Sequence, residues 1–430
     1  MTMEFLTRPT LTKLANIHYF LKWDEGVEIK CEFIHEGRNR HIEADITITD
    51  TAELNGTLLY GPHRSFITKS WKNIVKELED KSSRDDWAQR LQYVSAMVPK
   101  EHRSGKPTRA LDFAEINTSP RQVISNLLYE GTNVCVFGKG GIGKSLFCLN
   151  LIQGLHSGYQ VAGLDVIQQN TLWLDWETTE GLAHWRNKEI LEARGIEAGR
   201  WNDPDHPNSG RGHMVFHREM VGPLENNIEP LIMDIERMGI GTLLIDSAIP
   251  ACGGEAESPK PSQNFFDALA ALRPDNRPLS SIIVAHVTKD RAGSRSTTPA
   301  TPFGSTVWTD RARDTYELRA SQKRNARFTN FALHHRKTNM GPLRDSLCFR
   351  LTWANGCTIE SINIREDRGL VAGLNLNDQA YYFISENGPM SLDDLSRRID
   401  ATDSDILMAL EFDYRLTETD ETWDTSELDY

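Results

Sequence analysis

The sequence predicts an α/β fold in which a mostly parallel sheet forms the core, with a smaller module before it and another after it. Three observations carry this prediction. Short apolar runs alternate with helix-length segments from about residue 110 to residue 350, which is typical of a parallel sheet with helices on both faces. Runs of alternating character precede this region, and a pair of capped helices follows it. We therefore expect domains at residues 1–107, 108–365 and 375–430.

The first module is predicted to be a small α+β domain. Val27–Ile34 and His41–Thr49 alternate apolar and polar side chains, as half-buried strands do. Apolar residues at helical spacing follow in Trp71–Leu78 and Trp87–Val94. The next segment, Val98–Pro107, contains two prolines, a glycine and four charged residues, so we expect it to be a linker.

The central domain is predicted from four buried strands and a meander. The buried strands are Val134–Phe137, Thr171–Asp175, Thr242–Asp246 and Ser281–Ala285. Beyond Thr315 the alternating runs are longer and their connections shorter. We expect these runs, Thr315–Ala320 and Phe328–His335, to form an antiparallel meander that closes the sheet.

The last fifty residues predict a small helical module. It contains Tyr381–Ser385, a turn at Asn387–Pro389 and then a helix that Ser391 is placed to cap, with a second helix from Asp403 or Ser404. This pattern resembles the helical part of a winged-helix module. Residues 411–430 hold eight carboxylates against one arginine, so protein contact or packing is favoured over the reading of DNA.

Composition restricts the location of the protein. The longest apolar stretches, such as Phe265–Leu272, are far shorter than the ~20 residues that cross a bilayer. Arg8 and Lys13 interrupt the apolar residues of the N-terminus, so no secretory signal is predicted and we expect a cytoplasmic protein without a membrane partner. The six cysteines form no CxxC pair, which argues against a zinc cluster or disulfide framework and favours buried thiols.

A phosphate-binding loop follows the first buried strand of the central domain. The loop consists of Gly138, Lys139, Gly140, Gly141, Ile142, Gly143, Lys144 and Ser145. Its spacing is that of the GxxxxGK[ST] motif, in which glycines let backbone N–H groups converge on phosphate oxygens at a helix N-terminus. Lys144 would reach the β and γ phosphates of ATP, and Ser145 would hold Mg²⁺.

Two carboxylates lie at or just past the ends of other strands. Asp246 ends Thr242–Asp246, and a buried aspartate is costly unless it is paired or near a metal, so we predict that it holds Mg²⁺. Glu177 lies just past the end of Thr171–Asp175, at the sheet edge where ligands bind in open α/β folds.

With these motifs the central domain resembles the RecA superfamily, and more closely the RepA-like hexameric helicases of plasmids and their AAA-family relatives. The resemblance implies a RecA-like P-loop NTPase core. It also implies that Glu177 polarises the attacking water, with Glu180 as a competitor one turn later. His286 ends the strand Ile282–His286, where the family has a polar residue that senses the γ-phosphate.

Two later segments extend the resemblance. Gly304–Val307, continued to Arg313, resembles the family's GSS…R element, and this implies an arginine finger that acts across a subunit boundary. The family spacing selects Arg313 over Arg311. The run Lys-Thr-Asn-Met-Gly-Pro resembles a K-x-N-x-G-P motif, which implies that its first residue, Lys337, also approaches a phosphate, with Arg336 as the weaker candidate.

Charge is distributed unevenly along the chain. The formal net charge is −13, yet between His286 and Asp345 it is 12 − 5 = +7, which leaves −20 for the remainder. The resemblance implies that a loop of this basic segment meets DNA in the pore of a ring. A basic flexible strip suits phosphate contact with single strands, and Lys289, Arg291 and Arg295 are the candidates. A solvated surface loop without a ligand is the alternative.

The sequence therefore predicts an ATP-hydrolysing motor that assembles as a homo-oligomer, expected to be a hexamer, and acts on single-stranded DNA with ATP and Mg²⁺. The predicted role is that of a helicase in the replication of a plasmid, phage or other mobile element. One alternative is a nucleotide-switched DNA-binding or loading factor that does not unwind. Another is a regulatory or defence ATPase that acts on protein partners through its N-terminal module and acidic tail.

Overall fold

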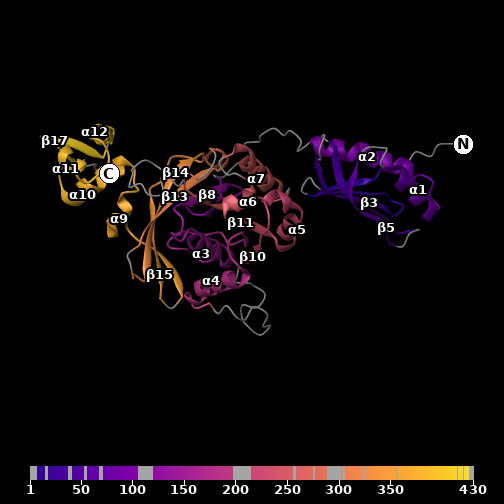
Figure 1. Ribbon diagram of the computed structural model, residues 1–430, viewed down its shortest axis with the longest axis horizontal. Helices are drawn as coiled ribbons and strands as arrows, with labels where there is room; N and C mark the ends of the chain where they lie inside the picture. The colour runs from indigo at the N-terminus through magenta and orange to yellow at the C-terminus, as the bar shows by residue number, and fades with distance from the viewer. Residues whose placement is uncertain are drawn as a thin grey trace. The chain divides into compact units, whose positions relative to one another are not determined.

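The computed structural model divides the chain into two compact units, residues 1–119 with 271–277 and residues 120–270 with 278–430 (Figure 1). It describes every residue except 1–6, 15–17, 37–40, 53–55, 67–70, 105–119, 197–214, 255–257, 275–276, 288–301, 303–305, 323–324, 355, 414, 420 and 426–430.

The first unit is an antiparallel sheet with two helices on one face. Its strands are β1 (Thr10–Leu14), β2 (His18–Lys22), β3 (Val27–Glu36), β4 (Ile42–Asp50) and β5 (Gly56–Ser65), paired in chain order. Its helices are α1 (Lys72–Lys81) and α2 (Trp87–Ser104). Alternate residues of β2, β3 and β4 meet the apolar side chains of both helices in one core. The two strands expected from alternation are β3 and β4, while β1, β2 and β5 were not anticipated.

The expected linker at Val98–Pro107 is wrong as far as Ser104, because α2 runs through Pro99. Val98 is fully buried and continues the apolar row of Leu91 and Val94. Burial of this row stabilises the last helical turns by more than the one backbone hydrogen bond that proline cannot make.

The second unit is built on a nine-stranded sheet in the order β10-β9-β11-β12-β8-β13-β14-β15-β16. The strands are β8 (Asn133–Gly138), β9 (Asn170–Asp175), β10 (Phe216–Glu219), β11 (Ile240–Asp246), β12 (Ser280–His286), β13 (Asp314–Ser321), β14 (Phe328–Thr338), β15 (Leu347–Trp353) and β16 (Cys357–Ser361). The pairs from β10 to β13 are parallel, and those from β13 to β16 are antiparallel. This is the predicted parallel core with its closing meander, and the four predicted buried strands are β8, β9, β11 and β12.

Helices lie on both sides of this sheet (Figure 1). They are α3 (Lys144–Ser157), α4 (Glu180–Glu192), α5 (Ile228–Met238), α6 (Ala248–Cys252), α7 (Pro259–Ala271) and α8 (Val307–Arg311), with the 3₁₀ turn η3 (Leu224–Asn226) and the short hairpin β6 (Gln122–Ile124) and β7 (Leu128–Tyr129). The buried face of α3 packs against alternate residues of the parallel strands, including Val134, Val136 and Trp173. Because β8, β9, β11 and β12 are parallel, their carboxyl ends meet at one edge of the sheet, and the helices hold that edge in place.

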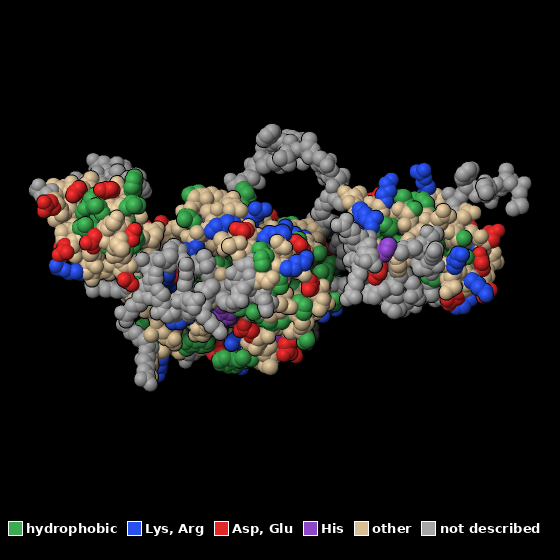
Figure 2. Space-filling view, turned by 45° about the horizontal axis from the view of Figure 1, so that its top comes forward, with side chains coloured by type: hydrophobic (Ala, Val, Ile, Leu, Met, Phe, Trp, Pro, Cys, Tyr) green, Lys and Arg blue, Asp and Glu red, His purple; other side chains and the backbone are tan. Residues whose placement is uncertain are grey.

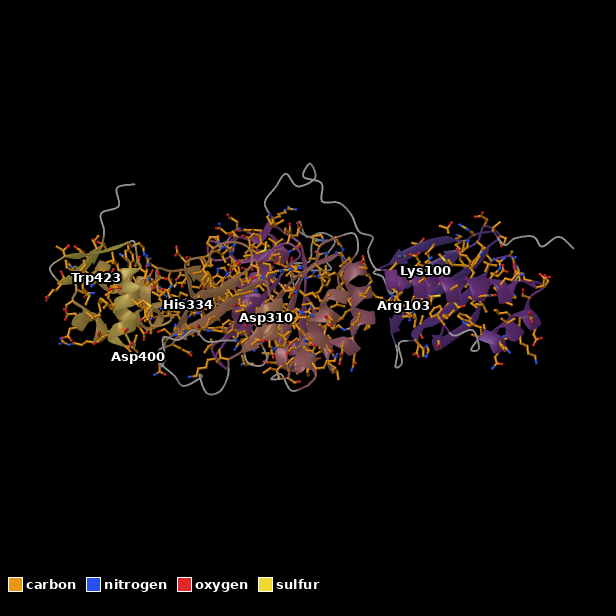
Figure 3. All side chains as sticks on the ribbon, turned by 90° about the horizontal axis from the view of Figure 1, so that it is seen from above. Lys100, Arg103, Asp310, His334, Asp400 and Trp423 are labelled. Atoms are coloured by element: carbon orange, nitrogen blue, oxygen red, sulfur yellow. The ribbon has the colours of Figure 1, made fainter. Side chains whose placement is uncertain are left out.

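The chain ends in a small helical module with a hairpin. Its elements are η5 (Ile364–Glu366), α9 (Arg368–Val371), α10 (Leu376–Asn387), α11 (Leu392–Ser396), α12 (Asp403–Glu411), β17 (Leu416–Thr419) and β18 (Thr422–Thr425). As predicted, Ser391 caps α11 by accepting the backbone N–H of Asp394, and α12 begins at Asp403. Trp423 on β18 forms two backbone hydrogen bonds with Met390, so the hairpin is joined to the helices. Figure 3 labels Trp423 in this module. The winged-helix assignment stays a prediction.

The cysteines and the lengths of the helices bear on two expectations from composition. All six cysteines are free and buried. Burial raises the pKa of Cys135 to about 12 and that of Cys357 to about 11, so these thiols are packing residues. Within the described part of the chain, each helix is too short or too polar to cross a bilayer.

Candidate nucleotide site

The phosphate loop lies between β8, which ends at Gly138, and α3, which begins at Lys144. Gly141 and Gly143 adopt φ values of +74° and +95°, which residues other than glycine rarely adopt. A Cβ on Gly138 would overlap the carbonyl oxygen of Leu318 on β13. Glycine is thus required twice for the turn and once for close strand packing, and the predicted strand, loop and helix are all present.

Lys144 is buried and folded back onto its own loop. Its Nζ donates to the carbonyl oxygens of Gly138 at 3.0 Å and Lys139 at 2.9 Å, and lies 3.4 Å from Nδ1 of His286. An ammonium group can only donate, so Nδ1 of His286 accepts and the histidine proton is on Nε2. Burial lowers the pKa of Lys144, while the carboxylates of Asp246 and Glu177 oppose this change. The lysine is therefore placed to exchange backbone carbonyls for phosphate oxygens.

Asp246 ends β11, two strands from the phosphate loop, and is buried. Neither carboxylate oxygen has a hydrogen bond of normal geometry to the described residues. Burial raises the pKa of Asp246 to about 7, and the nearby Ser145 hydroxyl opposes part of the rise. A buried carboxylate with two free oxygens next to a hydroxyl fits the ligand preference of Mg²⁺, so Ser145 and Asp246 are the residues that would hold this ion.

A turn that the Asp175 carboxylate stabilises follows β9 and contains Glu177. Oδ1 of Asp175 accepts the backbone N–H of Glu177 at 2.9 Å and that of Thr178 at 3.0 Å. Oδ2 of Asp175 accepts from the Thr178 hydroxyl and from Nε2 of His217. Burial raises the pKa of Asp175, but these hydrogen bonds outweigh it and hold the pKa below its ordinary value. Asp175 is therefore an ionised acceptor that fixes the turn.

Glu177 faces the phosphate loop with its side chain 43% exposed. Its Oε1 accepts the Ser247 hydroxyl at 2.6 Å and lies 4.0 Å from Nε2 of His286. The nearby His286 is the main cause that lowers the pKa of Glu177, followed by the hydrogen bond from Ser247, and burial opposes both. An ionised, accessible carboxylate near a bound phosphate can accept a proton from an attacking water. Glu180, its competitor, is the exposed first residue of α4.

The structure thus brings five predicted residues together at the carboxyl edge of the sheet. They are Lys144, Ser145, Glu177, Asp246 and His286. His286 connects them because one ring nitrogen faces Lys144 and the other faces Glu177.

Sequence reasoning missed three residues that shape this site: Asp175, Ser247 and Arg186. Asp175 with Thr178 three residues later has the pattern of a side-chain-capped turn, which was a usable signal. Ser247 gave no signal, because its role depends on the neighbouring strand β9. Burial dominates the pKa of Asp246, and Arg186 on α4 is among the groups that oppose the rise, so its charge acts on the site.

Arg313 lies at the opposite edge of the same sheet. It is exposed and directly precedes β13, which runs parallel to β8 with Asp314 opposite Val134. Arg313 is level with Asn133, five residue steps before Gly138, so it starts about 17 Å from the phosphate loop along the strand direction, at ~3.3 Å per residue. Arg313 and the phosphate loop of one chain therefore lie at different edges.

Lys337 lies beside Arg313 and away from the phosphate loop of its own chain. It is opposite Thr315 on β14, and its Nζ donates to the carbonyl oxygen of Ala312. Burial lowers the pKa of Lys337, and the charge of Arg313 adds to this effect. The weaker candidate, Arg336, is held by Glu317 and by the carbonyl oxygen of Gly373. The basic pair at this edge is therefore Arg313 with Lys337.

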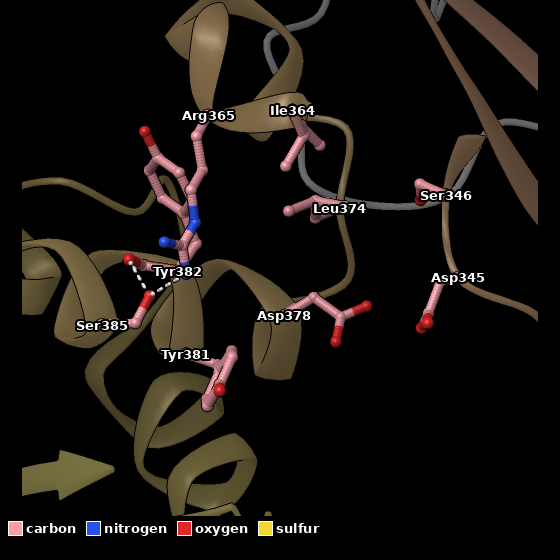
Figure 4. Close-up of a pocket in the computed structure, with 9 residues that line it drawn as sticks. All are labelled: Asp345, Ser346, Ile364, Arg365, Leu374, Asp378, Tyr381, Tyr382 and Ser385. Carbon is pink, nitrogen blue, oxygen red and sulfur yellow. Dashed lines mark hydrogen bonds between the residues drawn. The ribbon is translucent and has the colours of Figure 1, made fainter. Parts of the chain in front are cut away.

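The remaining predicted residues, Lys289, Arg291 and Arg295, lie outside the described residues. A cavity of about 170 Å³ is present elsewhere in the second unit, between Asp345, Ser346, Arg365 and helix α10 (Figure 4). Its lining shares no residue with the five that gather at the carboxyl edge. The cavity is therefore separate from the candidate nucleotide site.

The comparison with protein-family models agrees with the site. Residues 100–292 match the family model of an AAA domain. A similar solved structure is that of a KaiC-like protein from the hyperthermophilic archaeon Pyrococcus horikoshii OT3, with 15% identity over 60% of this chain and 100% of that chain, at a TM-score of 0.39. No curated protein sequence matches the chain.

The family match and the phosphate loop, set in a large mostly parallel sheet, define the class. Over residues 100–292 the chain is similar to an AAA domain, and its phosphate loop lies between a strand and a helix, as in P-loop nucleotide-binding sites.

Proposed function

We propose that the chain is a ring-forming ATPase that moves along single-stranded DNA, a RepA-like helicase in the replication of a plasmid, phage or other mobile element. One observation carries the proposal: the predicted catalytic residues are divided between opposite edges of the sheet. Lys144, Asp246 and Glu177 are at the carboxyl edge, whereas Arg313 and Lys337 are at the amino edge.

This division supports a site that two chains share. The separation along β8 and β13 is longer than an extended arginine side chain, so Arg313 of one chain does not reach the phosphates of that chain. In a head-to-tail ring, one edge of each chain faces the other edge of the next. A permanent, forked guanidinium suits the negative charge that spreads over a transferring phosphoryl group, and Lys337 would add a second cation beside it.

The chain's own residues suggest how hydrolysis would proceed. Lys144 would leave the carbonyl oxygens of Gly138 and Lys139 to bind phosphate oxygens. Glu177, held by Ser247 and by the Asp175 turn, would accept a proton from the attacking water. Mg²⁺ held by Ser145 and Asp246 would neutralise charge on the phosphates.

The DNA part of the proposal rests on charge. The segment from His286 to Asp345 carries +7 in a chain of −13. Its candidates for phosphate contact are Lys289, Arg291 and Arg295, which precede Arg313 in the sequence. Contact that depends on phosphates weakens steeply with salt. Stimulation of ATP hydrolysis by single-stranded DNA that disappears as salt rises would therefore support this part.

The test of the shared site mixes inactive variants. Arg313→Ala and Glu177→Gln should each abolish hydrolysis, and their mixture should recover part of it, because an Arg313→Ala chain beside a Glu177→Gln chain has one complete site. A mixture of Lys144→Ala with Glu177→Gln is the matched control, since both changes damage the same edge and no complete site forms. Arg311→Ala should leave activity intact. The shared site would be contradicted if neither mixture recovered hydrolysis and the wild type remained fully active as a dilute monomer.

The alternatives predict different results in the same preparations. A loading factor would show DNA-stimulated hydrolysis without strand displacement. An ATPase that acts on protein partners would show no stimulation by single-stranded DNA even at low salt. All three proposed functions require that Lys144→Ala abolishes hydrolysis, so this variant tests the nucleotide site alone.

A further inference from the structure

The outward side of α12 is apolar where an ordinary surface helix is polar. Leu407, Met408 and Phe412 are 36%, 56% and 80% exposed. The inward side is already complete, because Ile406 and Leu410 are fully buried in the core of the C-terminal module. The helix therefore has two apolar sides, of which the described residues cover one.

Carboxylates surround this apolar side. Asp403, Asp405 and Glu411 are exposed on the same helix. Residues 375–430 contain only three arginines, and each of them interacts elsewhere. Arg397 pairs with Asp393, Arg415 pairs with Asp378 and Asp413, and Arg398 lies over the ring of Phe383.

The whole module repeats this imbalance. Residues 375–430 contain three arginines and fifteen carboxylates, so 3 − 15 = −12 of the chain's net −13 resides there. Figure 2 shows hydrophobic and acidic side chains gathered together on this module. Like charge disfavours nucleic acid, an anionic lipid surface and a second copy of the module as occupants of such a surface.

We propose that the α12 face, which we define as Leu407, Met408 and Phe412 with Asp403, Asp405 and Glu411, docks a basic protein segment that carries apolar side chains. The apolar residues of the partner would cover Met408 and Phe412, and its lysines or arginines would pair with the surrounding carboxylates. The complementary charge selects the partner, and the buried apolar area holds it. This docking does not depend on ring formation or on DNA binding.

The test uses two fluorescent peptides and the full chain at about 0.15 M salt. One peptide is an amphipathic helix of leucine and lysine, and the other has the same lysines with glutamine in place of leucine. We expect the leucine peptide to bind at least about tenfold more tightly by fluorescence anisotropy, which corresponds to ~1.4 kcal/mol. In Met408→Ser/Phe412→Ser this difference should disappear, and Asp405→Asn/Glu411→Gln should weaken both peptides.

Val221→Ser is the matched control, because Val221 is 86% exposed outside the C-terminal module, and it should change nothing. Equal binding of the two peptides to the wild type would overturn the proposal, and so would unchanged binding to Met408→Ser/Phe412→Ser with an unaltered thermal transition. Sedimentation velocity adds a third outcome. Self-association of the wild type that Met408→Ser/Phe412→Ser abolishes would assign the face to a second copy and overturn the basic partner.

Discussion

Replacement of Asp175 tests whether the turn after β9 positions Glu177, the proposed general base. Asp175→Ala removes the acceptor of four hydrogen bonds, including the backbone N–H groups of Glu177 and Thr178. Asp175→Asn keeps an oxygen in the place of Oδ1, where both N–H groups donate, but replaces Oδ2, the acceptor of Thr178 and His217, with an NH2 group. The two variants therefore separate the pairing of the two backbone N–H groups from the other contacts of Asp175.

The expected magnitudes follow from these contacts. Two backbone N–H groups left without an acceptor cost about 1–3 kcal/mol each, so Asp175→Ala should lower the free energy of unfolding by about 2–6 kcal/mol. Asp175→Asn should cost about 1–3 kcal/mol, because both backbone N–H groups keep their acceptor but the hydrogen bonds from Thr178 and His217 are lost. A misplaced general base loses a contribution of roughly 10²–10⁴, so kcat should fall at least about 100-fold in Asp175→Ala and less than about tenfold in Asp175→Asn.

The pH dependence of stability provides a second measure of the same contacts. The folded-state pKa of Asp175 is lowered, so its stabilisation is complete above the ordinary pKa of aspartate and is lost as pH falls through the lowered value. Chemical denaturation of wild type across acidic pH should show this loss. Both variants should lack it.

A double variant decides whether Asp175 acts through Glu177. Steady-state ATP hydrolysis of Asp175→Ala/Glu177→Gln should equal that of Glu177→Gln, because residues that act as a unit are not additive. A further fall of the same factor as in Asp175→Ala alone would show that Asp175 acts independently, and the assigned role of the turn would be refuted.

Three other predictions concern a titrating carboxyl, a glycine and a proline. Burial raises the pKa of Asp246 to about 7, so the folded, nucleotide-free protein binds a proton that the unfolded chain has lost. Between the ordinary pKa of aspartate and about 7, the free energy of unfolding should therefore fall as pH rises. Over the same range, the affinity for nucleotide with Mg²⁺ should rise. Asp246→Asn should remove both dependences on pH. Gly138→Ala should cost about 1–3 kcal/mol in thermal unfolding because its Cβ would overlap the Leu318 carbonyl. Gly140→Ala should cost little, because Nδ1 of His286 would lie 3.8 Å from the added Cβ. Pro99→Ala should stabilise the first unit against denaturant by about 1–3 kcal/mol by adding a backbone donor inside α2, and a loss of stability would contradict the assigned helix.

The sequence pattern was sufficient to predict those elements whose structure depends on one continuous stretch of chain. The strands β8, β9, β11 and β12 are continuous apolar runs, and the phosphate loop has fixed spacing between strand and helix, so both could be predicted. The same local reasoning failed at Val98–Pro107. A proline suggested a break, but packing of Val98 into the core decided the conformation.

The parts of the site that could not be predicted depend on the register between strands. Ser247 reaches Glu177 because β11 pairs with β9 so that Asp246 is opposite Asp175. The position of Arg313 at the far edge depends on the pairing of β13 with β8, which spacing in the sequence does not specify. A motif can identify a finger residue, but only the sheet order shows which edge it occupies.

The pairing of β8 with β13 gives the proposed shared site a further property. The phosphate loop begins at Gly138, where the absence of a Cβ lets the Leu318 carbonyl approach closely, and Arg313 precedes the other end of the same strand pair. Parallel backbone hydrogen bonds from Asp314 to Glu317 make this pair one element that resists sliding. In a ring, that element would extend from the phosphates of one site to the finger of the adjacent site. In the proposed ring, a change in the phosphate loop would then reach the next site as a displacement of the whole strand pair.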